Sequence, residues 1–201
     1  MISHEYRMIF IHIPKTGGTS IEKMFGALKT KKITFEKSKK QVDIMPFKVE
    51  KHYDASDVEV QYKNFIESYF KWTIVRNPWE REYSFYNMVN GRRKNKKTFL
   101  EYLKTTKINK KDKVLQDQIN FIFNKKNQKP IVDKIVRYEN LANDWKNICQ
   151  IIKKPFEEMI HINKGEYEEE ISKAYNQECV DFVAELRKKD IEYLKYDLPK
   201  I

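Results

Sequence analysis

A short apolar strand, a glycine loop and a helix form the part of this sequence that most constrains its fold. Residues 8–13 (MIFIHI) make a nearly continuous apolar run, which is typical of a strand buried on both faces of a parallel sheet. The segment HIPKTGGTS (12–20) overlaps its end, and IEKMFGAL (21–28) has the apolar spacing of a helix. Thr19 and Glu22 are spaced as a capping box, so we expect the helix to begin there.

Two further strand–helix units follow. Residues 72–75 (WTIV) predict a second strand. Asn77 before Pro78 then predicts the start of a helix that stops near Gly91. Residues 134–136 predict a third strand, and the helix after it carries one apolar stripe. That stripe consists of Leu141, Trp145, Ile148, Cys149 and Ile152.

The remaining segments give weaker signals. Asp54 and Asp57 are spaced to cap a helix that runs toward Ser68. Short strands are expected at 32–35 and 47–52, and helices around 99–103, 114–123 and 176–196. Because strands alternate with helices, the sequence predicts an α/β fold around a central, mostly parallel sheet. With 201 residues, it fits one domain that spans residues 1–201.

The charge is unevenly distributed along the chain. The net charge is +11, but residues 1–165 carry 34 basic and 19 acidic side chains, whereas residues 166–201 are acidic overall. A basic body attracts polyanionic partners such as nucleic acid, an anionic membrane, an anionic polysaccharide or a phosphorylated cofactor. Lysines spread over any exposed face explain the same count, so charge alone does not choose among these partners.

Several classes of protein are disfavoured. The two cysteines, Cys149 and Cys179, are too few and too far apart for a disulfide framework or a zinc site, and no cluster of metal ligands is apparent. No run approaches the ~20 apolar residues of a transmembrane helix. The first residues lack a signal peptide's cleavage site. We therefore expect a cytoplasmic protein without a metal.

The glycine loop has the chemistry of an anion cradle. Glycines allow a backbone to pass close to a ligand, lysine adds a positive charge, and hydroxyls add hydrogen-bond donors. The residues concerned are Lys15, Thr16, Gly17, Gly18, Thr19 and Ser20. The order differs from the Walker A motif, in which the lysine follows the glycines. The alternative is an ordinary glycine turn between strand and helix, but the coincidence of lysine, two glycines and three hydroxyls at a helix start favours the cradle.

A second candidate site follows the second strand. Arg76 stands at the carboxyl end of that strand, where α/β folds place ligands, and Ser84 lies on the helix that follows. A guanidinium and a hydroxyl together can bind a phosphate. Taken alone, the motif is also explained by a capped helix with surface charges.

The two motifs together resemble those of sulfotransferases that use 3′-phosphoadenosine 5′-phosphosulfate (PAPS). The similarity is to the group of heparan sulfate 2-O- and 6-O-sulfotransferases and related bacterial proteins. HIPKTGGTS resembles the 5′-phosphosulfate loop of that family, and VRNPWEREYSFY (75–86) resembles its 3′-phosphate site. Further matching segments, in the family's order, are KIVRYENL (134–141), HIN (161–163) and DIEYLKYD (190–197).

The resemblance implies a P-loop-like three-layer sandwich with PAPS as co-substrate and no metal. It implies that Lys15 contacts the phosphosulfate, while Arg76 and Ser84 bind the 3′-phosphate. Lys164 stands where such enzymes close a loop over the nucleotide. The residues that would hold the 5′-phosphate are Thr16, Gly17, Gly18, Thr19 and Ser20.

An acceptor hydroxyl needs a general base. His52 precedes a predicted helix, in a stretch where 6-O-like relatives carry such a histidine, so we favour it. His12 is more simply a histidine of the sheet, His161 is ambiguous, and His4 is expected in a frayed end. Glu22 is the alternative base.

The sequence thus predicts a bacterial or viral-type enzyme that transfers a sulfuryl group from PAPS to a hydroxyl, with a glycan as the expected acceptor. Lipid, tyrosine and phenol hydroxyls stay open. A nucleotide-dependent kinase is one alternative, which the lysine-before-glycine order disfavours. A basic nucleic-acid-binding protein is another, but no recognition helix, stacking platform or zinc motif supports it, so no nucleic-acid partner is expected.

Overall fold

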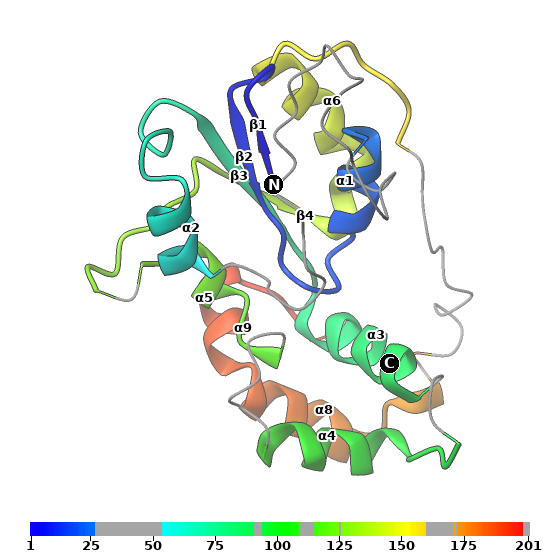
Figure 1. Ribbon diagram of the computed structural model, residues 1–201. Helices are drawn as coiled ribbons and strands as arrows, with labels where there is room; N and C mark the ends of the chain where they lie inside the picture. The colour runs from blue at the N-terminus through cyan, green and yellow to red at the C-terminus, as the bar shows by residue number, and fades with distance from the viewer. Residues whose placement is uncertain are drawn as a thin grey trace. The chain divides into compact units, whose positions relative to one another are not determined.

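The structure is a computed structural model that describes residues 1–26, 54–90, 94–108, 115–124, 126–159, 171 and 173–198. Its contacts divide the chain into two compact units (Figure 1). Unit 1 consists of Met1–Val75 and Asn120–Ile162, and unit 2 consists of Arg76–Ile119 and Asn163–Ile201. The single domain expected over residues 1–201 stays a prediction.

A four-stranded sheet forms the centre of unit 1. Its strands, in spatial order, are β1 (Ile2–Ser3), β2 (Met8–Ile11), β3 (Phe70–Val75) and β4 (Lys134–Arg137). β2, β3 and β4 are parallel to one another, and β1 runs antiparallel to β2. The three predicted strands are confirmed, whereas β1 was not anticipated. Because β2, β3 and β4 are parallel, their carboxyl ends share one edge of the sheet, where α/β folds place ligands.

Helices cover the sheet of unit 1. In Figure 1, α1 (Gly18–Met24) and α6 (Leu141–Ile151) lie on one side of it and α2 (Ala55–Gln61) on the other. All of β2 and the last four residues of β3 are buried, as expected for strands covered on both faces. The core beneath α1 and α6 includes Met8, Phe10, Ile21, Phe25, Trp72, Ile74, Val136, Leu141, Trp145, Ile148 and Cys149. The predicted apolar stripe and the α/β fold, a central mostly parallel sheet flanked by helices, are confirmed.

Helix α2 begins where the sequence predicts. The Asp54 side chain accepts a hydrogen bond from the Asp57 N–H, and the Asp57 carboxylate accepts one from the Asp54 N–H, which completes a capping box. The helix ends at Gln61, so its expected extension toward Ser68 is wrong. The carbonyl of Tyr62 accepts hydrogen bonds from the N–H groups of Phe65 and Ile66, so the chain forms turns after the helix.

Other expected elements differ from the structure or lie beyond it. The short strands expected at 32–35 and 47–52 lie outside the described residues. Of the helix expected over 114–123, the described residues form only α5 (Ile119–Ile122). The reason is that the N–H groups of Gln118 and Ile119 donate to the carboxylate of Asp190, which replaces the helical pattern there.

Unit 2 is built from helices. They are α3 (Pro78–Asn90), α4 (Phe99–Ile108), α8 (Gln177–Leu186) and α9 (Lys188–Leu194). α3, α4 and α8 pack on one another, and α9 contacts α8. Oδ1 of Asn77 accepts a hydrogen bond of 3.0 Å from the Trp79 N–H, so the predicted start of α3 is confirmed. The helices expected near 99–103 and 176–196 are confirmed as well.

Polar bonds tie α3 into the interior of unit 2. The indole N–H of Trp79 donates to the carbonyl of Val180 at 3.1 Å. The hydroxyl of Tyr175 donates to the carbonyl of Trp79 at 2.7 Å. Both aromatic side chains are buried, so their polar atoms need such partners. These bonds fix the first turn of α3 against the chain around α8.

Candidate active site: the loop after β2 and the start of α3

A tight loop, residues 12–17, joins β2 to α1 in unit 1. Two of its residues have a positive φ, 66° at Lys15 and 85° at Gly17. Between them, Thr16 is fully buried, and its hydroxyl donates to the carbonyl of Ile13 at 2.9 Å. A left-handed conformation costs a non-glycine residue about 1–2 kcal/mol. Such strain at Lys15 is typical of loops that bind ligands.

Helix α1 begins earlier than the sequence pattern predicts. Its first residue is Gly18, its N-cap position is Gly17, and no side chain caps it. The predicted capping box of Thr19 and Glu22 is therefore wrong. Thr19 lies inside the first turn, so its hydroxyl does not occupy the cap position.

Glu22 instead pairs with His12. Oε1 of Glu22 lies 2.7 Å from Nδ1 of His12, and the two side chains are only 9% and 11% exposed. The ring of Phe10 stacks on that of His12, with centroids 6.0 Å apart. A carboxylate at this distance accepts a hydrogen bond from Nδ1–H, which fixes the orientation of the His12 ring. His12 and Glu22 thus join the start of the loop to α1.

The two glycines are required by close contacts with the protein's own rings. A Cβ atom on Gly18 would lie 2.3 Å from Cδ2 of His12, which is closer than real Cβ contacts. A Cβ atom on Gly17 would lie 2.9 Å from two ring carbons of Tyr138. Tyr138 begins the short helical turn η2 (Tyr138–Asn140) after β4. The loop is therefore packed against residues at the ends of both β2 and β4.

Exposure alternates along the loop and the start of α1. Lys15, Gly17 and Thr19 are partly exposed. By contrast, Thr16 and Ser20 are buried. Lys15, Gly17 and Thr19 are therefore accessible at the surface of the loop and of the first turn of α1, and their contact with a ligand stays a prediction. The Thr16 hydroxyl donates to the carbonyl of Ile13 inside the loop. We therefore expect Thr16 to contact a phosphate through its backbone N–H.

In unit 2, three polar side chains line the start of α3. Arg76 is the first residue after β3, and its Nε lies 3.2 Å from Oε2 of Glu80. Ser84 is partly buried and lies one helical turn beyond Glu80. Residues four apart share a helix face, so Glu80 and Ser84 lie on the face that the Arg76 side chain contacts. The binding of a phosphate by Arg76 and Ser84 stays a prediction.

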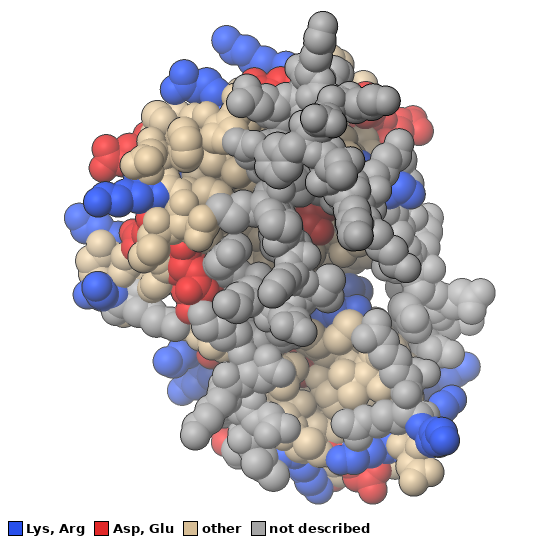
Figure 2. Space-filling view, viewed as in Figure 1, with Lys and Arg blue, Asp and Glu red and all other residues tan. Residues whose placement is uncertain are grey.

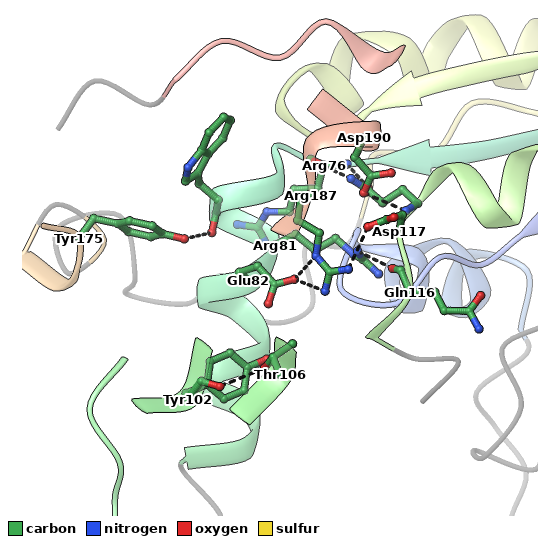
Figure 3. Close-up of polar contacts among 12 residues, drawn as sticks. Arg76, Arg81, Glu82, Tyr102, Thr106, Gln116, Asp117, Tyr175, Arg187 and Asp190 are labelled. Carbon is green, nitrogen blue, oxygen red and sulfur yellow. Dashed lines mark hydrogen bonds and ion pairs between the residues drawn. The ribbon is translucent and has the colours of Figure 1, made fainter. Parts of the chain in front are cut away.

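The same helix contributes to a buried charge network (Figure 3). Nη2 of Arg187 lies 2.7 Å from Oε1 of Glu82, and its Nη1 lies 3.0 Å from Oδ1 of Asp117. Burial by itself lowers the pKa of Arg187, but the two carboxylates raise it above its ordinary value, so Arg187 stays charged. Arg81 is also buried and donates to the carbonyl of Gln116. The plainer explanation of this motif, surface charges on a capped helix, is therefore wrong for Arg81 and Glu82.

The structure places some of the candidate residues and not others. His52, Lys164 and the alternative base His161 lie outside the described residues. Nδ1 of His4 lies 2.7 Å from the hydroxyl of Tyr69, so the expectation of a frayed end at His4 is wrong.

The described residues contain no group of three or more His, Cys, Asp or Glu side chains arranged to hold a metal ion. Within the same residues, no helix combines the length and the apolar character needed to cross a membrane.

One protein family matches nearly the whole chain. The model of the protein family described as "Sulfotransferase family" matches residues 1–197, which span both units. Among solved structures, mouse sulfotransferase SULT7A1 complexed with PAP is similar at 17% identity and a TM-score of 0.46, over 100% of this chain and 70% of that chain. A sulfotransferase from Alicyclobacillus acidocaldarius is similar at 15% identity and a TM-score of 0.36, over 70% of this chain and 62% of that one. A search among curated proteins finds no match.

Proposed function

The chain belongs to the Sulfotransferase family and is a PAPS-dependent sulfotransferase, and we propose that its acceptor is a carbohydrate hydroxyl and its general base is His52. The match spans both compact units, which supports treating residues 1–201 as one working domain. The cytoplasmic location stays a prediction from the sequence.

The loop after β2 supports this proposal most. Bound PAPS supplies an activated sulfuryl group on a phosphate. The exposed groups of the loop suit that anion: the ammonium of Lys15, the backbone at Gly17 and the hydroxyl of Thr19. We assign Lys15 to the phosphosulfate, where its charge offsets the negative charge that develops on the bridging oxygen. We assign Thr16, Gly18 and Ser20 to the loop's shape and to backbone contacts with the 5′-phosphate.

The second site is assigned to the 3′-phosphate. The guanidinium of Arg76 can donate two parallel hydrogen bonds to a phosphate, and Ser84 can donate one. The carboxylate of Glu80 pairs with Arg76 and lies on the helix face that the phosphate would approach. Lys164, outside the described residues, is assigned to closing the site over the nucleotide. A site of this kind separates PAPS from nucleotides that lack a 3′-phosphate.

The reaction proposed is an in-line displacement at sulfur. A bond forms from the acceptor oxygen to sulfur while the bond from sulfur to the bridging oxygen breaks, and 3′-phosphoadenosine 5′-phosphate (PAP) leaves. The acceptor proton passes to the base, for which His52 has a suitable reference pKa near neutrality. The buried pairing of His12 with Glu22 favours a role for those two residues in holding the loop rather than as the base.

The carbohydrate acceptor is proposed from the resemblance to heparan sulfate sulfotransferases and from the basic charge of residues 1–165. Figure 2 shows lysine and arginine side chains on the visible surface of both units. Acidic glycans are attracted by such a surface, and the attraction weakens with salt. The basic residues therefore predict a preference for glycans that already carry negative charge.

One experiment tests this function. The purified protein is incubated with sulfur-labelled PAPS and a panel of glycans, phenols and tyrosine peptides, and labelled products are separated. We expect label in an acidic glycan. Label only in phenols or peptides would reject the carbohydrate acceptor but keep sulfuryl transfer. The absence of any labelled product, together with no binding of PAP, would reject the function itself.

A further inference from the structure

A side-chain amide pairs with both backbone polar groups of Arg76. Oε1 of Gln118 accepts a hydrogen bond from the Arg76 N–H, and Nε2 of Gln118 donates one to the Arg76 carbonyl, each at 2.9 Å. The last registered pair between β3 and β4 is Val75 with Arg137, one residue earlier. The amide of Gln118 thus provides Arg76 with the donor and acceptor that a neighbouring strand would provide.

Gln118 is itself fixed by a buried carboxylate. Oδ2 of Asp190 accepts the Gln118 N–H at 2.8 Å, and its Oδ1 accepts the Ile119 N–H at 3.0 Å. Gln118 and Asp190 are both fully buried. Figure 3 shows Asp190 close to Arg76 in unit 2. One of these bonds reaches Gln118 and the other its neighbour Ile119, so the Asp190 carboxylate fixes the segment whose amide pairs with Arg76.

The side chain of Arg76 is held at its other end by Glu80. With the backbone clamped by Gln118 and Nε within 3.2 Å of Oε2 of Glu80, both ends of a long, flexible side chain are fixed. Arginine loses about 2 kcal/mol of rotamer entropy when it is fully ordered. An arginine that is already ordered before binding loses less on contact with a phosphate, so it binds more tightly.

We propose that Gln118, supported by Asp190, is a positioning residue that aims Arg76 at the 3′-phosphate and thereby sets the selectivity for 3′-phosphorylated nucleotides. The inference rests on the proposed role of Arg76. A purely structural role for Gln118 would alter the binding of every nucleotide equally. A positioning role alters only the part of the affinity that comes from the 3′-phosphate.

The experiment measures the part of the affinity that comes from the 3′-phosphate. Dissociation constants for PAP and for adenosine 5′-monophosphate, which lacks only the 3′-phosphate, are determined by calorimetry at fixed salt. Their ratio is the selectivity. We expect Gln118→Met, which loses both hydrogen bonds at similar volume, to lower the selectivity about tenfold. Gln118→Glu keeps only the acceptor for the Arg76 N–H and should lower the selectivity less. This variant replaces Gln118→Met in the test if Gln118→Met does not fold.

Two further variants distinguish a failure of the 3′-phosphate site from a failure of the role proposed for Gln118. Thr106→Val removes another buried hydrogen bond in unit 2, from the Thr106 hydroxyl to the Tyr102 carbonyl, and should leave the selectivity unchanged. Arg76→Ala should remove most of the selectivity and leave the part that Ser84 contributes, and adding Gln118→Met to it should cause no further loss. An unchanged selectivity in Arg76→Ala would reject the 3′-phosphate site and the inference with it. A collapse in Arg76→Ala, with wild-type selectivity in the Gln118 variants, would overturn the inference alone.

Discussion

Nδ1 of His12 and Oε1 of Glu22 lie 2.7 Å apart, and this pair links the residue after β2 to the second turn of α1. The loop between them carries Lys15 at a positive φ. Because both partners are about nine-tenths buried, neither can be removed without leaving the other short of a hydrogen bond in the interior. The shape of the loop therefore depends on a contact between its first residue and α1.

The contact between Gly18 and His12 predicts the effect of a single methyl group. Gly18→Ala places a Cβ atom 2.3 Å from the His12 ring, so either the ring or the backbone must move. We expect a loss of about 1–3 kcal/mol in the free energy of unfolding, as for overpacked cores, and weaker PAP binding. Thermal unfolding and calorimetry measure the two effects.

The matched control is Gly26→Ala at the other end of α1. Gly26 has a φ of 77°, but no atom lies within 4 Å of a Cβ built there. In this variant the free energy of unfolding should fall only by the backbone strain of about 1–2 kcal/mol, and PAP binding should be unchanged. Equal PAP binding by both variants would contradict the proposed importance of the contact with His12.

Lys15 is predicted to act on the transition state. Lys15→Ala removes the ammonium proposed to contact the phosphosulfate, so kcat should fall by about 10²–10³-fold, as for other lost electrostatic donors. Lys23→Ala makes the same charge change at an exposed position on α1 and should keep kcat. Steady-state rates with labelled PAPS distinguish them, and similar losses in both would reject a specific role for Lys15.

Glu80 has two opposite effects, because it orders the Arg76 side chain and also repels the phosphate, and we predict that the repulsion is the larger. Its carboxylate pairs with Arg76, the residue proposed to bind the 3′-phosphate. Glu80→Gln keeps the size of the side chain but removes a charge that repels the phosphate. PAP should therefore bind severalfold more tightly, and the gain should shrink as salt is raised. Weaker PAP binding in this variant would mean that Glu80 orders Arg76 more than it repels the ligand.

The pairing of Arg187 with Glu82 predicts a large effect on stability. Arg187→Met leaves the carboxylate of Glu82 buried without its cation, so the free energy of unfolding should fall by about 3–5 kcal/mol. Replacing both residues, as Arg187→Met with Glu82→Leu, should recover much of that loss. Denaturant unfolding of the single and the double variant measures the loss and the recovery of this free energy. A double variant no more stable than the single one would show that the remaining partners, Asp117 included, dominate.

His52 is predicted to be the base. His52→Ala should lower kcat by about 10²–10⁴-fold and leave PAP binding unchanged, because a general base acts on the acceptor and not on the nucleotide. His4→Ala, at a histidine bonded to Tyr69, is the control and should keep kcat. A normal kcat in His52→Ala would mean that the general base is another residue, such as His161, His12 or Glu22.

Local patterns in the sequence were sufficient for much of the framework. The strands β2, β3 and β4, the caps at Asp54 and Asn77, and the apolar stripe of α6 all follow from residues close together in the chain. Such features depend on backbone propensity, periodicity and capping within a few residues, which a sequence displays directly. The order of the motifs was likewise sufficient to indicate the family.

Only the tertiary structure decided which distant groups meet. Glu22 has the spacing of a capping residue, yet it pairs with His12, and Glu82 pairs with Arg187 across 105 positions. Gln118 belongs to no motif, and its role appears only where its amide meets the backbone of Arg76. The physical reason is that a polar side chain can satisfy its hydrogen bonds with many partners, and the folded chain determines which of them is within 3 Å.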